Sequence, residues 1–199
     1  MRGSVSDFRL KSALKPFTRQ RTDPLRQLVT AIDLLNKGVT LIVGALLMLV
    51  AAAVLWQVTV RFVLTAAGVN ISAPWTEELA RYSLIWMVFL GAGIGVRHAQ
   101  MIALEFGVRK LPDQAGVVVR YLSIALAVAF FVLLIWVGLK FVDLGRSETS
   151  PVLGITKDLV YWAMPVGAAL MLVNSLALVI DTVLQGRDIR FVADHAPEA

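Results

Sequence analysis

Residues 75–105 read WTEELARYSLIWMVFLGAGIGVRHAQMIALE and decide the fold of this chain. The stretch opens on an acidic pair, Glu77 and Glu78, and Arg81 follows one helical turn later. An uncharged run of 15 residues, 82–96, comes next. At about 1.5 Å of rise per residue this run covers roughly 22 Å, less than the roughly 30 Å of a hydrocarbon core. The turn with Glu78 and Arg81 is therefore expected at the membrane boundary or shielded by protein.

The composition places the chain among membrane proteins. Of its 199 residues, 58% are hydrophobic and 17% are charged, and the apolar residues form runs long enough to span a bilayer. The absence of Cys excludes disulfides and thiolate metal sites. The net charge of +5 is unevenly distributed, which fits membrane orientation better than nucleic-acid binding.

The hydrophobic runs predict an all-α, polytopic membrane domain over residues 24–185. Each run is uncharged over most of its length and is bounded by polar or turn-forming residues. Four transmembrane helices are expected at about 39–62, 77–98, 117–141 and 159–184.

An amphipathic helix is expected before the first span, over residues 24–37, in the membrane interface. Asp23 is the expected N-cap and Pro24 the first helical residue. Residues 1–23 are expected to form a flexible, basic cytoplasmic tail, and residues 186–199 a second cytoplasmic tail.

The distribution of Lys and Arg predicts the orientation. Of the 19 Lys and Arg residues, 14 lie in the N-terminal segment, the connection between spans two and three, or the C-terminal tail. The other five lie on the opposite side. Cytoplasmic segments carry the excess of basic residues, so both termini are expected in the cytoplasm.

Small and polar side chains inside the spans mark expected helix–helix contacts. Gly91 and Gly95 have a spacing that allows close approach of two helices. Asn174 is the strongly polar side chain in the middle of the fourth span and is expected to hydrogen-bond a neighbouring helix. Pro165, in the second turn of the same span, predicts a kink.

The charges beside the second span leave two interpretations open. Arg61 can snorkel to the lipid headgroups, or it can pair with Glu77 or Glu78 across the short connection. Arg81 is placed to meet Glu77 at i,i+4 and Glu78 at i,i+3. We expect this cluster to be buried between helices or against another subunit, where its ion pairs matter most.

The sequence offers no catalytic or cofactor chemistry. No acid lies at the centre of a span, and with only two His a bis-histidine haem within one chain is implausible. No metal-ligand spacing, broken helix or internal repeat is found. We therefore expect no enzyme activity, no catalytic residue, no cofactor and no metal site, and we interpret the chain as a helical partner or scaffold.

Two ordered motifs indicate a family. The run from Trp75 to Tyr82, with Trp86 and the glycines after it, is close to the pattern W-x-E-E-x-x-R-Y. The run S-P-V-L-G-I from Ser150, followed by Pro165, is close to S-P-x-L-G-I. Over about residues 35–184 the chain thus resembles the small membrane subunit, the Q or DctQ-like component, of tripartite ATP-independent periplasmic (TRAP) transporters.

The chain departs from the family's pattern after the second span. Family members often have a His, an aliphatic residue and an acid there, whereas this chain reads MIALE over 101–105, with His98 three residues early. A role of the family's His is therefore not carried over to this chain.

The resemblance implies a scaffold in the bacterial inner membrane, in contact with lipid and not with nucleic acid. Its implied partners are a large multi-span subunit that carries the substrate and sodium sites, and a periplasmic binding protein that delivers a solute, usually a carboxylate-bearing one. The candidate interface or structural residues are Trp75, Glu77, Glu78, Arg81, Trp86, Gly91, Gly95, Pro151, Gly154, Pro165 and Asn174.

Two other classes of protein remain open. The first is a membrane anchor subunit of a respiratory or redox complex, which a haem absorbance band would identify. The second is a self-sufficient small exporter, which would transport its substrate when reconstituted alone.

Overall fold

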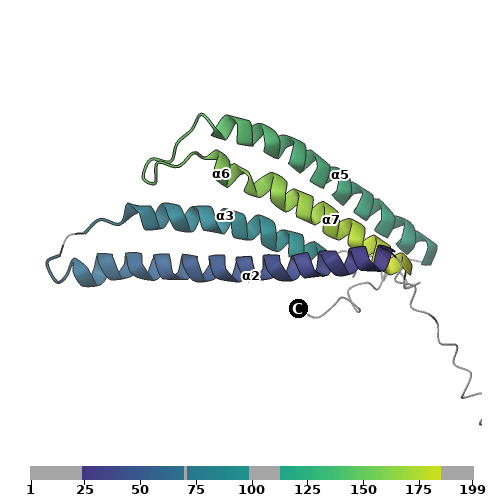
Figure 1. Ribbon diagram of the computed structural model, residues 1–199, viewed down its shortest axis with the longest axis horizontal. Helices are drawn as coiled ribbons and strands as arrows, with labels where there is room; N and C mark the ends of the chain where they lie inside the picture. The colour runs from purple at the N-terminus through teal and green to yellow at the C-terminus, as the bar shows by residue number, and fades with distance from the viewer. Residues whose placement is uncertain (1–23, 70, 99–112, 185–199) are drawn as a thin grey trace, which may run out of the picture.

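The computed structural model describes residues 24–69, 71–98 and 113–184, and these residues form an all-α membrane domain (Figure 1). Four helical stretches are long and apolar enough to cross a membrane, which confirms the predicted fold class. Both predicted tails lie outside the described residues. The elements are α2 (Pro24–Thr59), the π-helical turn η1 (Val60–Leu64), α3 (Pro74–Arg97), α5 (Asp113–Gly145), α6 (Asp158–Tyr161) and α7 (Ala163–Leu184).

The first helix is longer than the sequence predicted. The structure joins the segment 24–37 and the first span into one helix of 36 residues, which passes through Gly38 without a break. A Gly inside a helix costs only about 1 kcal/mol relative to Ala, so the apolar turns on both sides outweigh it. The helix ends in η1, where the Thr65 hydroxyl donates to the Val60 carbonyl at 3.1 Å.

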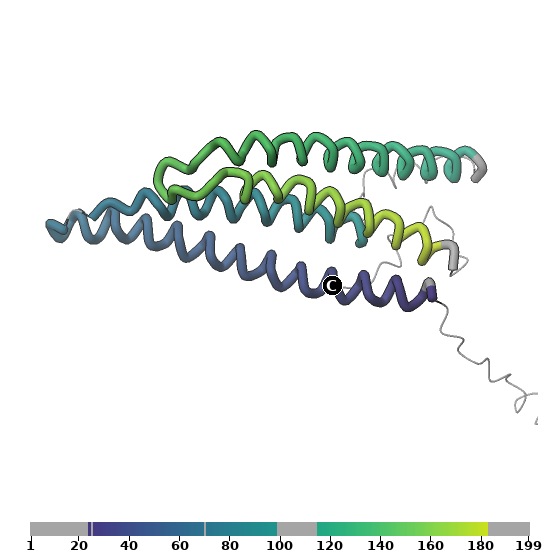
Figure 2. Tube along the Cα trace, turned by 45° about the horizontal axis from the view of Figure 1, so that its top comes forward, coloured from purple at the N-terminus to yellow at the C-terminus, as the bar shows by residue number. Residues whose placement is uncertain are grey.

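The helices form a three-helix group with a fourth helix on one side. Helix α3 packs against both α2 and α7, α2 also touches α7, and α5 packs on α6 and α7 (Figure 2). We call the end with the α2–α3 and α5–α6 connections the loop end, and the end where α2 begins and α7 ends the terminal end (Figure 1). Helices α3 and α7 both run from the loop end to the terminal end, and α2 and α5 run the opposite way.

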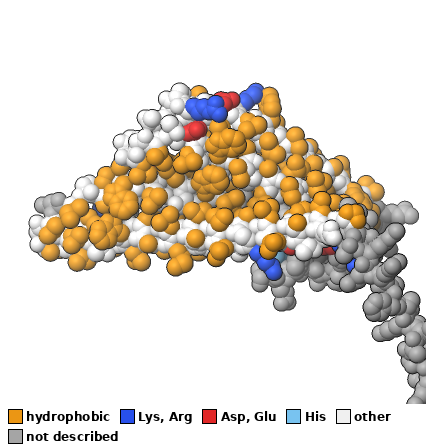
Figure 3. Space-filling model, viewed as in Figure 1, with side chains coloured by type: hydrophobic (Ala, Val, Ile, Leu, Met, Phe, Trp, Pro, Cys, Tyr) orange, Lys and Arg blue, Asp and Glu red, His pale blue; other side chains and the backbone are white. Residues whose placement is uncertain are grey.

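The face of the domain drawn in Figure 3 is largely apolar. Leu41, Met48 and Leu126 are 76%, 75% and 64% exposed, and α2 is the least buried of the four spans. In water such a surface would be unfavourable, but against lipid chains it carries no such cost. The specificity of the fold therefore comes from close packing and from polar contacts between helices.

Two glycines bring α3 and α7 together. A Cβ on Gly167 would lie 2.8 Å from the Phe89 carbonyl oxygen, and a Cβ on Gly93 would lie 2.6 Å from Leu170 Cδ2. Gly91 has no atom within 4 Å of an added Cβ, so it makes no close contact with the other described helices. Its close approach to a further helix stays a prediction. Gly95 is half-buried.

Gly167→Ala should destabilise the purified chain in detergent by about 1 kcal/mol. Overpacking typically costs about 1–3 kcal/mol, and the higher helix propensity of Ala offsets about 1 kcal/mol of it. The clash is with the backbone of Phe89, so no change of rotamer relieves it and the helices must separate. Gly91→Ala is the matched control and should leave the thermal midpoint unchanged or raised. Equal thermal midpoints for the two variants would contradict the close contact between α3 and α7 at Gly167.

The fourth span is interrupted near its start, where the sequence predicted a kink. Helix α6 ends at Tyr161, and α7 begins at Ala163. Pro165 has no N–H to donate to the Tyr161 carbonyl, so one bond of the helical ladder is missing there. The buried Pro165 ring instead lies against α5, where a Cβ on Gly138 would approach its Cδ to 2.8 Å.

Candidate functional site: two polar clusters between the helices

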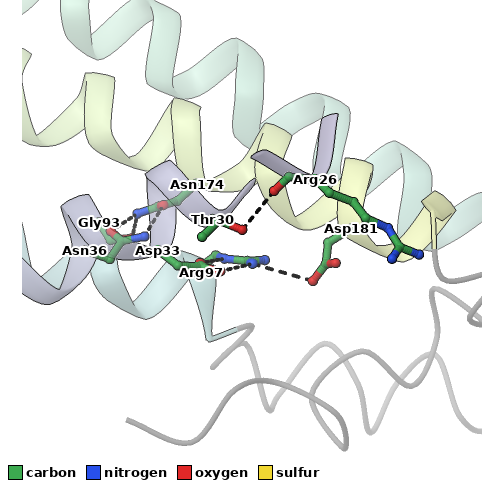
Figure 4. A network of polar contacts seen from close by, with 8 residues as sticks. All are labelled: Arg26, Thr30, Asp33, Asn36, Gly93, Arg97, Asn174 and Asp181. Carbon is green, nitrogen blue, oxygen red and sulfur yellow. Dashed lines mark hydrogen bonds and ion pairs between the residues drawn. The ribbon is translucent and has the colours of Figure 1, made fainter. Parts of the chain in front are cut away.

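An amide cluster joins α2, α3 and α7 in the interior near the terminal end. Asn36 and Asn174 exchange two hydrogen bonds, with Nδ2···Oδ1 distances of 2.7 and 2.9 Å (Figure 4). Asn174 Nδ2 also donates to the Gly93 carbonyl at 2.8 Å. Both amides are buried, and a buried amide without partners is costly. Asn174 therefore makes contacts between helices and has no free donor directed at a ligand.

An ionic cluster lies beside the amides and joins the same three helices. Arg97 Nε donates to Asp33 Oδ1 at 2.8 Å and Arg97 Nη2 donates to Asp33 Oδ2 at 3.2 Å, a two-point contact between α3 and α2 (Figure 4). Arg97 Nη2 also reaches Asp181 Oδ2 on α7 at 3.5 Å. The Arg97 side chain is only 3% exposed. A guanidinium fork suits this arrangement, because its donors are fixed in one plane.

A third contact lies at the loop end and brings the two sequence motifs together. Glu78 is buried, and its Oε2 accepts the Leu153 N–H at 2.8 Å, while its Oε1 accepts the Tyr82 hydroxyl at 3.0 Å. The Ser150 hydroxyl contacts the same carboxylate. Gly154 has φ +67°, a conformation that favours Gly and lets this loop close. The second residue of the acidic pair thus holds the S-P-V-L-G loop on the start of α3.

The rest of that loop is held by its own backbone. Thr149 and Thr156 form an isolated antiparallel bridge, and the Lys157 N–H donates to the Glu148 carbonyl at 2.9 Å. The Lys157 ammonium lies 3.0 Å from Glu148 Oε2. The hydrogen bond that Lys157 donates to that carboxylate raises the pKa of Lys157, so its ammonium stays charged at neutral pH.

Within this chain the charges at the start of α3 do not form one cluster buried between helices, which was the first of the two predicted environments. Arg81 Nη2 pairs with Glu77 Oε1 at 3.3 Å, but both side chains are 65% exposed. The predicted pair of Arg81 with Glu78 does not form, because Glu78 is used by the loop. Arg61 pairs with neither acid in the described part of the chain, and its guanidinium lies 5.8 Å from the centre of the Phe62 ring.

The other candidate residues divide between contacts and surface. The Trp86 indole N–H donates to the Leu159 carbonyl at 3.2 Å, which ties α3 to α6. Trp75 and Pro151 are exposed at the loop end, and His98 is half-buried just after α3. Residues 101–105, where the family's His was sought, lie outside the described residues.

The described residues provide little that could bind a solute or a metal ion. They contain no group of three or more His, Cys, Asp or Glu side chains placed to hold a metal. A pocket of about 280 Å³ lies between η1 and the start of α3, and its polar lining includes Gln57, Arg61 and Ser72. Two of the buried charged residues, Glu78 and Arg97, hold the protein's own helices and loop.

Comparison with known proteins identifies relatives of the chain. The family model for the DctQ component of tripartite ATP-independent periplasmic transporters matches residues 49–185. The chain is 26% identical over 144 residues to the sialic acid TRAP transporter small permease protein SiaQ of Vibrio cholerae, covering 72% of this chain and 80% of that protein. It is 29% identical over 109 residues to the C4-dicarboxylate TRAP transporter small permease protein DctQ of Rhodobacter capsulatus, covering 54% and 47%.

A longer protein also contains a region similar to this chain. The isethionate TRAP transporter permease protein DctMQ of Oleidesulfovibrio alaskensis is 29% identical over 113 residues. The match covers 53% of this chain but only 17% of that protein.

Proposed function

Because this chain belongs to the DctQ family of tripartite ATP-independent periplasmic transporter components, we propose that it is the non-catalytic scaffold of a solute importer. It is a multi-pass inner-membrane protein and a small permease subunit. Small subunits of these transporters work with a large permease and a binding protein. The comparisons give no support to the alternative of a redox anchor subunit.

The scaffold proposal rests on one observation: the buried polar groups named above bond other parts of the same chain. In the described part of the chain, Asn36, Asn174, Arg97 and Glu78 are each engaged by another helix or by a loop of the same chain. A transport site near the middle of the membrane needs polar groups that are directed at the solute or at a coupling ion. These groups instead fix the positions of helices, which is the property required of a static support.

The solute and its coupling ion are proposed on chemical grounds. Two of the relatives are named for sialic acid and C4-dicarboxylates, which carry carboxylates, and one is named for isethionate, a sulfonate. We propose an organic acid, with a carboxylate as the expected anionic group, taken up together with sodium. The sites for both would lie on the large subunit, and the binding protein would deliver the acid.

Reconstitution tests this proposal. Liposomes that contain the purified chain alone should show no uptake of a radiolabelled C4-dicarboxylate or sialic acid above empty liposomes. Liposomes that contain the chain with its large subunit should take up the transported acid when the binding protein is added. Replacing sodium by potassium outside should abolish the uptake. Transport by the chain alone would contradict the scaffold role.

The proposed topology has both termini in the cytoplasm, and it rests on the 14 to 5 asymmetry of Lys and Arg. A reporter enzyme that is active only in the periplasm should be inactive when fused after Ala199. The same reporter should be active when inserted near Glu148, in the connection between α5 and α6. The reverse pattern of activities would rule out this orientation.

A further inference from the structure

One face of α3 is left uncovered by the other helices that the structure describes. Glu77, Arg81, Leu84, Val88 and Ala92 are all exposed, and their spacing of three or four residues places them in one stripe along the helix. Helices α2 and α7 pack against the rest of α3 (Figure 2). We call these five residues the α3 stripe.

Arg81, near the loop end of the α3 stripe, lies inside the hydrocarbon layer. Lys37 on α2 and Arg61 on η1 are exposed and bound an uncharged stretch, and their 24-residue separation corresponds to about 36 Å of helix. A layer of about 30 Å centred between them leaves roughly 3 Å at each side. Pro74 lines the same pocket as Arg61, so α3 begins at that level. Arg81 is seven residues further along, about 10 Å deeper, and so about 7 Å inside the layer.

An exposed ion pair at this depth is not what a lipid-facing surface contains. Charged side chains within a span are costly against lipid and are usually directed at protein or water. On α2 the residues between Lys37 and Arg61 carry no charge, and on α5 the same holds between Arg120 and Lys140. Helix α3 is also the least apolar of the four spans. The exposed surfaces of α2 and α5 therefore suit lipid, and the α3 stripe suits a polar partner.

The part of the α3 stripe nearer the terminal end suits close packing against another helix. Ala92 is exposed, and the adjacent Gly91 has no atom within 4 Å of an added Cβ. Small residues let two helix backbones approach closely inside a membrane. Leu84 and Val88, between the ion pair and these small residues, are 42% and 64% exposed and offer apolar side chains to the same partner.

We propose that the α3 stripe is the surface on which the large transport subunit docks, with the Glu77–Arg81 pair meeting polar groups of that subunit. This rests on the proposed function, since it requires a membrane partner. The DctMQ relative supports a membrane partner of this kind, because the region similar to this chain forms only 17% of its length.

Photo-crosslinking of the intact complex locates the interface. A benzophenone amino acid in place of Val88 should crosslink the large subunit. The same benzophenone amino acid in place of Leu126 on α5 should crosslink lipid only. Both positions are 64% exposed, so exposure alone cannot produce the difference. If the large subunit copurifies with the chain but crosslinks at Leu126 and not at Val88, the docking surface is wrong and the proposed function stands. If no large subunit copurifies with the wild-type chain, the proposed function itself fails.

Removing the charges of both Glu77 and Arg81 tests whether this pair contacts the large subunit or the lipid headgroups. The double variant Glu77→Leu and Arg81→Leu leaves no unpaired charge, and it should bind the large subunit at least about tenfold more weakly, as expected when polar contacts within an interface are lost. The control is Asp143→Leu with Arg146→Leu, which removes a similar exposed pair, 73% and 66% exposed, from the loop end of α5. The control should bind as the wild type does. Equal binding by both double variants would place the Glu77–Arg81 pair against lipid headgroups and overturn the proposal.

Discussion

Arg97→Ala is expected to destabilise the isolated chain by about 3 kcal/mol or more, the largest effect of any single substitution considered. Removing one partner of a buried ion pair typically costs about 3–5 kcal/mol, because the remaining charge is left without compensation. Asp33 and Asp181 retain 38% and 27% exposure, so water compensates part of their charge and the lower end of that range applies. Thermal unfolding in detergent, followed by circular dichroism, measures the loss.

Two further variants test the assignment of this effect to the ionic cluster. Arg81→Ala removes an Arg of the same helix whose pair is 65% exposed, and in the isolated chain it should cost only about 0–1 kcal/mol. Adding Asp33→Asn to Arg97→Ala should recover part of the stability, because the carboxylate that makes the two-point contact with Arg97 is then removed as well. An Arg97→Ala midpoint equal to that of Arg81→Ala would show that the ionic cluster does not hold the helices.

Asn174→Leu is expected to cost about 2–3 kcal/mol. The substitution keeps a similar volume but leaves the buried Asn36 amide without the two hydrogen bonds that it exchanges with Asn174, and an unsatisfied buried group costs about 1–3 kcal/mol. Measured hydrogen bonds between membrane helices average lower, about 0.6 kcal/mol, so the unpaired amide accounts for most of the expected loss.

The double variant Asn36→Leu and Asn174→Leu should be more stable than Asn174→Leu alone. It removes both amides, and no donor or acceptor of this pair is left unsatisfied. A double-mutant cycle by thermal unfolding gives the coupling between the two residues. Additive losses for the two single variants would mean that the amides act independently and that the exchange of hydrogen bonds contributes no coupling energy.

The features of the fold that could be predicted from the sequence each depend on a single residue or on a single uncharged run of residues. Uncharged runs predicted the four spans, because a long apolar run has few alternatives to crossing a membrane, and the 15-residue run of the second span is extended by the turn that holds Glu78 and Arg81. Pro165 predicted the interruption of the fourth span, because its missing N–H is a local property. Asn174 predicted a contact between helices, because a polar group in the middle of a span needs a partner wherever that partner lies.

Partners distant in the chain could not be assigned from sequence in the same way. Asp33 and Asp181 meet Arg97 across separations of 64 and 84 residues, and no local pattern indicates which acid reaches which base. The sequence showed only that these acids and Arg97 stand close to the ends of apolar runs. Glu78 was linked to Arg81 by its i,i+3 spacing, but the loop around Leu153 offered it a backbone donor instead. A spacing rule shows which contacts are possible and cannot rank them against contacts from elsewhere.

The glycines illustrate the same limit. The Gly91-x-x-x-Gly95 spacing identified α3 as a helix with small residues, but the residue that α7 approaches within this chain is Gly93. Which side of α3 faces α7 depends on the rotation of the helix, and the mixture of Gly, Ala and apolar residues all round α3 leaves that rotation undetermined. The close contact and the carbonyl that accepts from Asn174 are both at Gly93, so one position serves both interactions.

Uptake by the complex without this chain tests the scaffold role most directly. Proteoliposomes should be prepared with the large subunit and the binding protein, with or without the small chain, and sodium-driven uptake of the transported acid should be measured. The scaffold role predicts that uptake falls to the level of empty liposomes when the chain is omitted and returns when it is added during reconstitution. Full uptake in its absence would contradict the role proposed for this subunit.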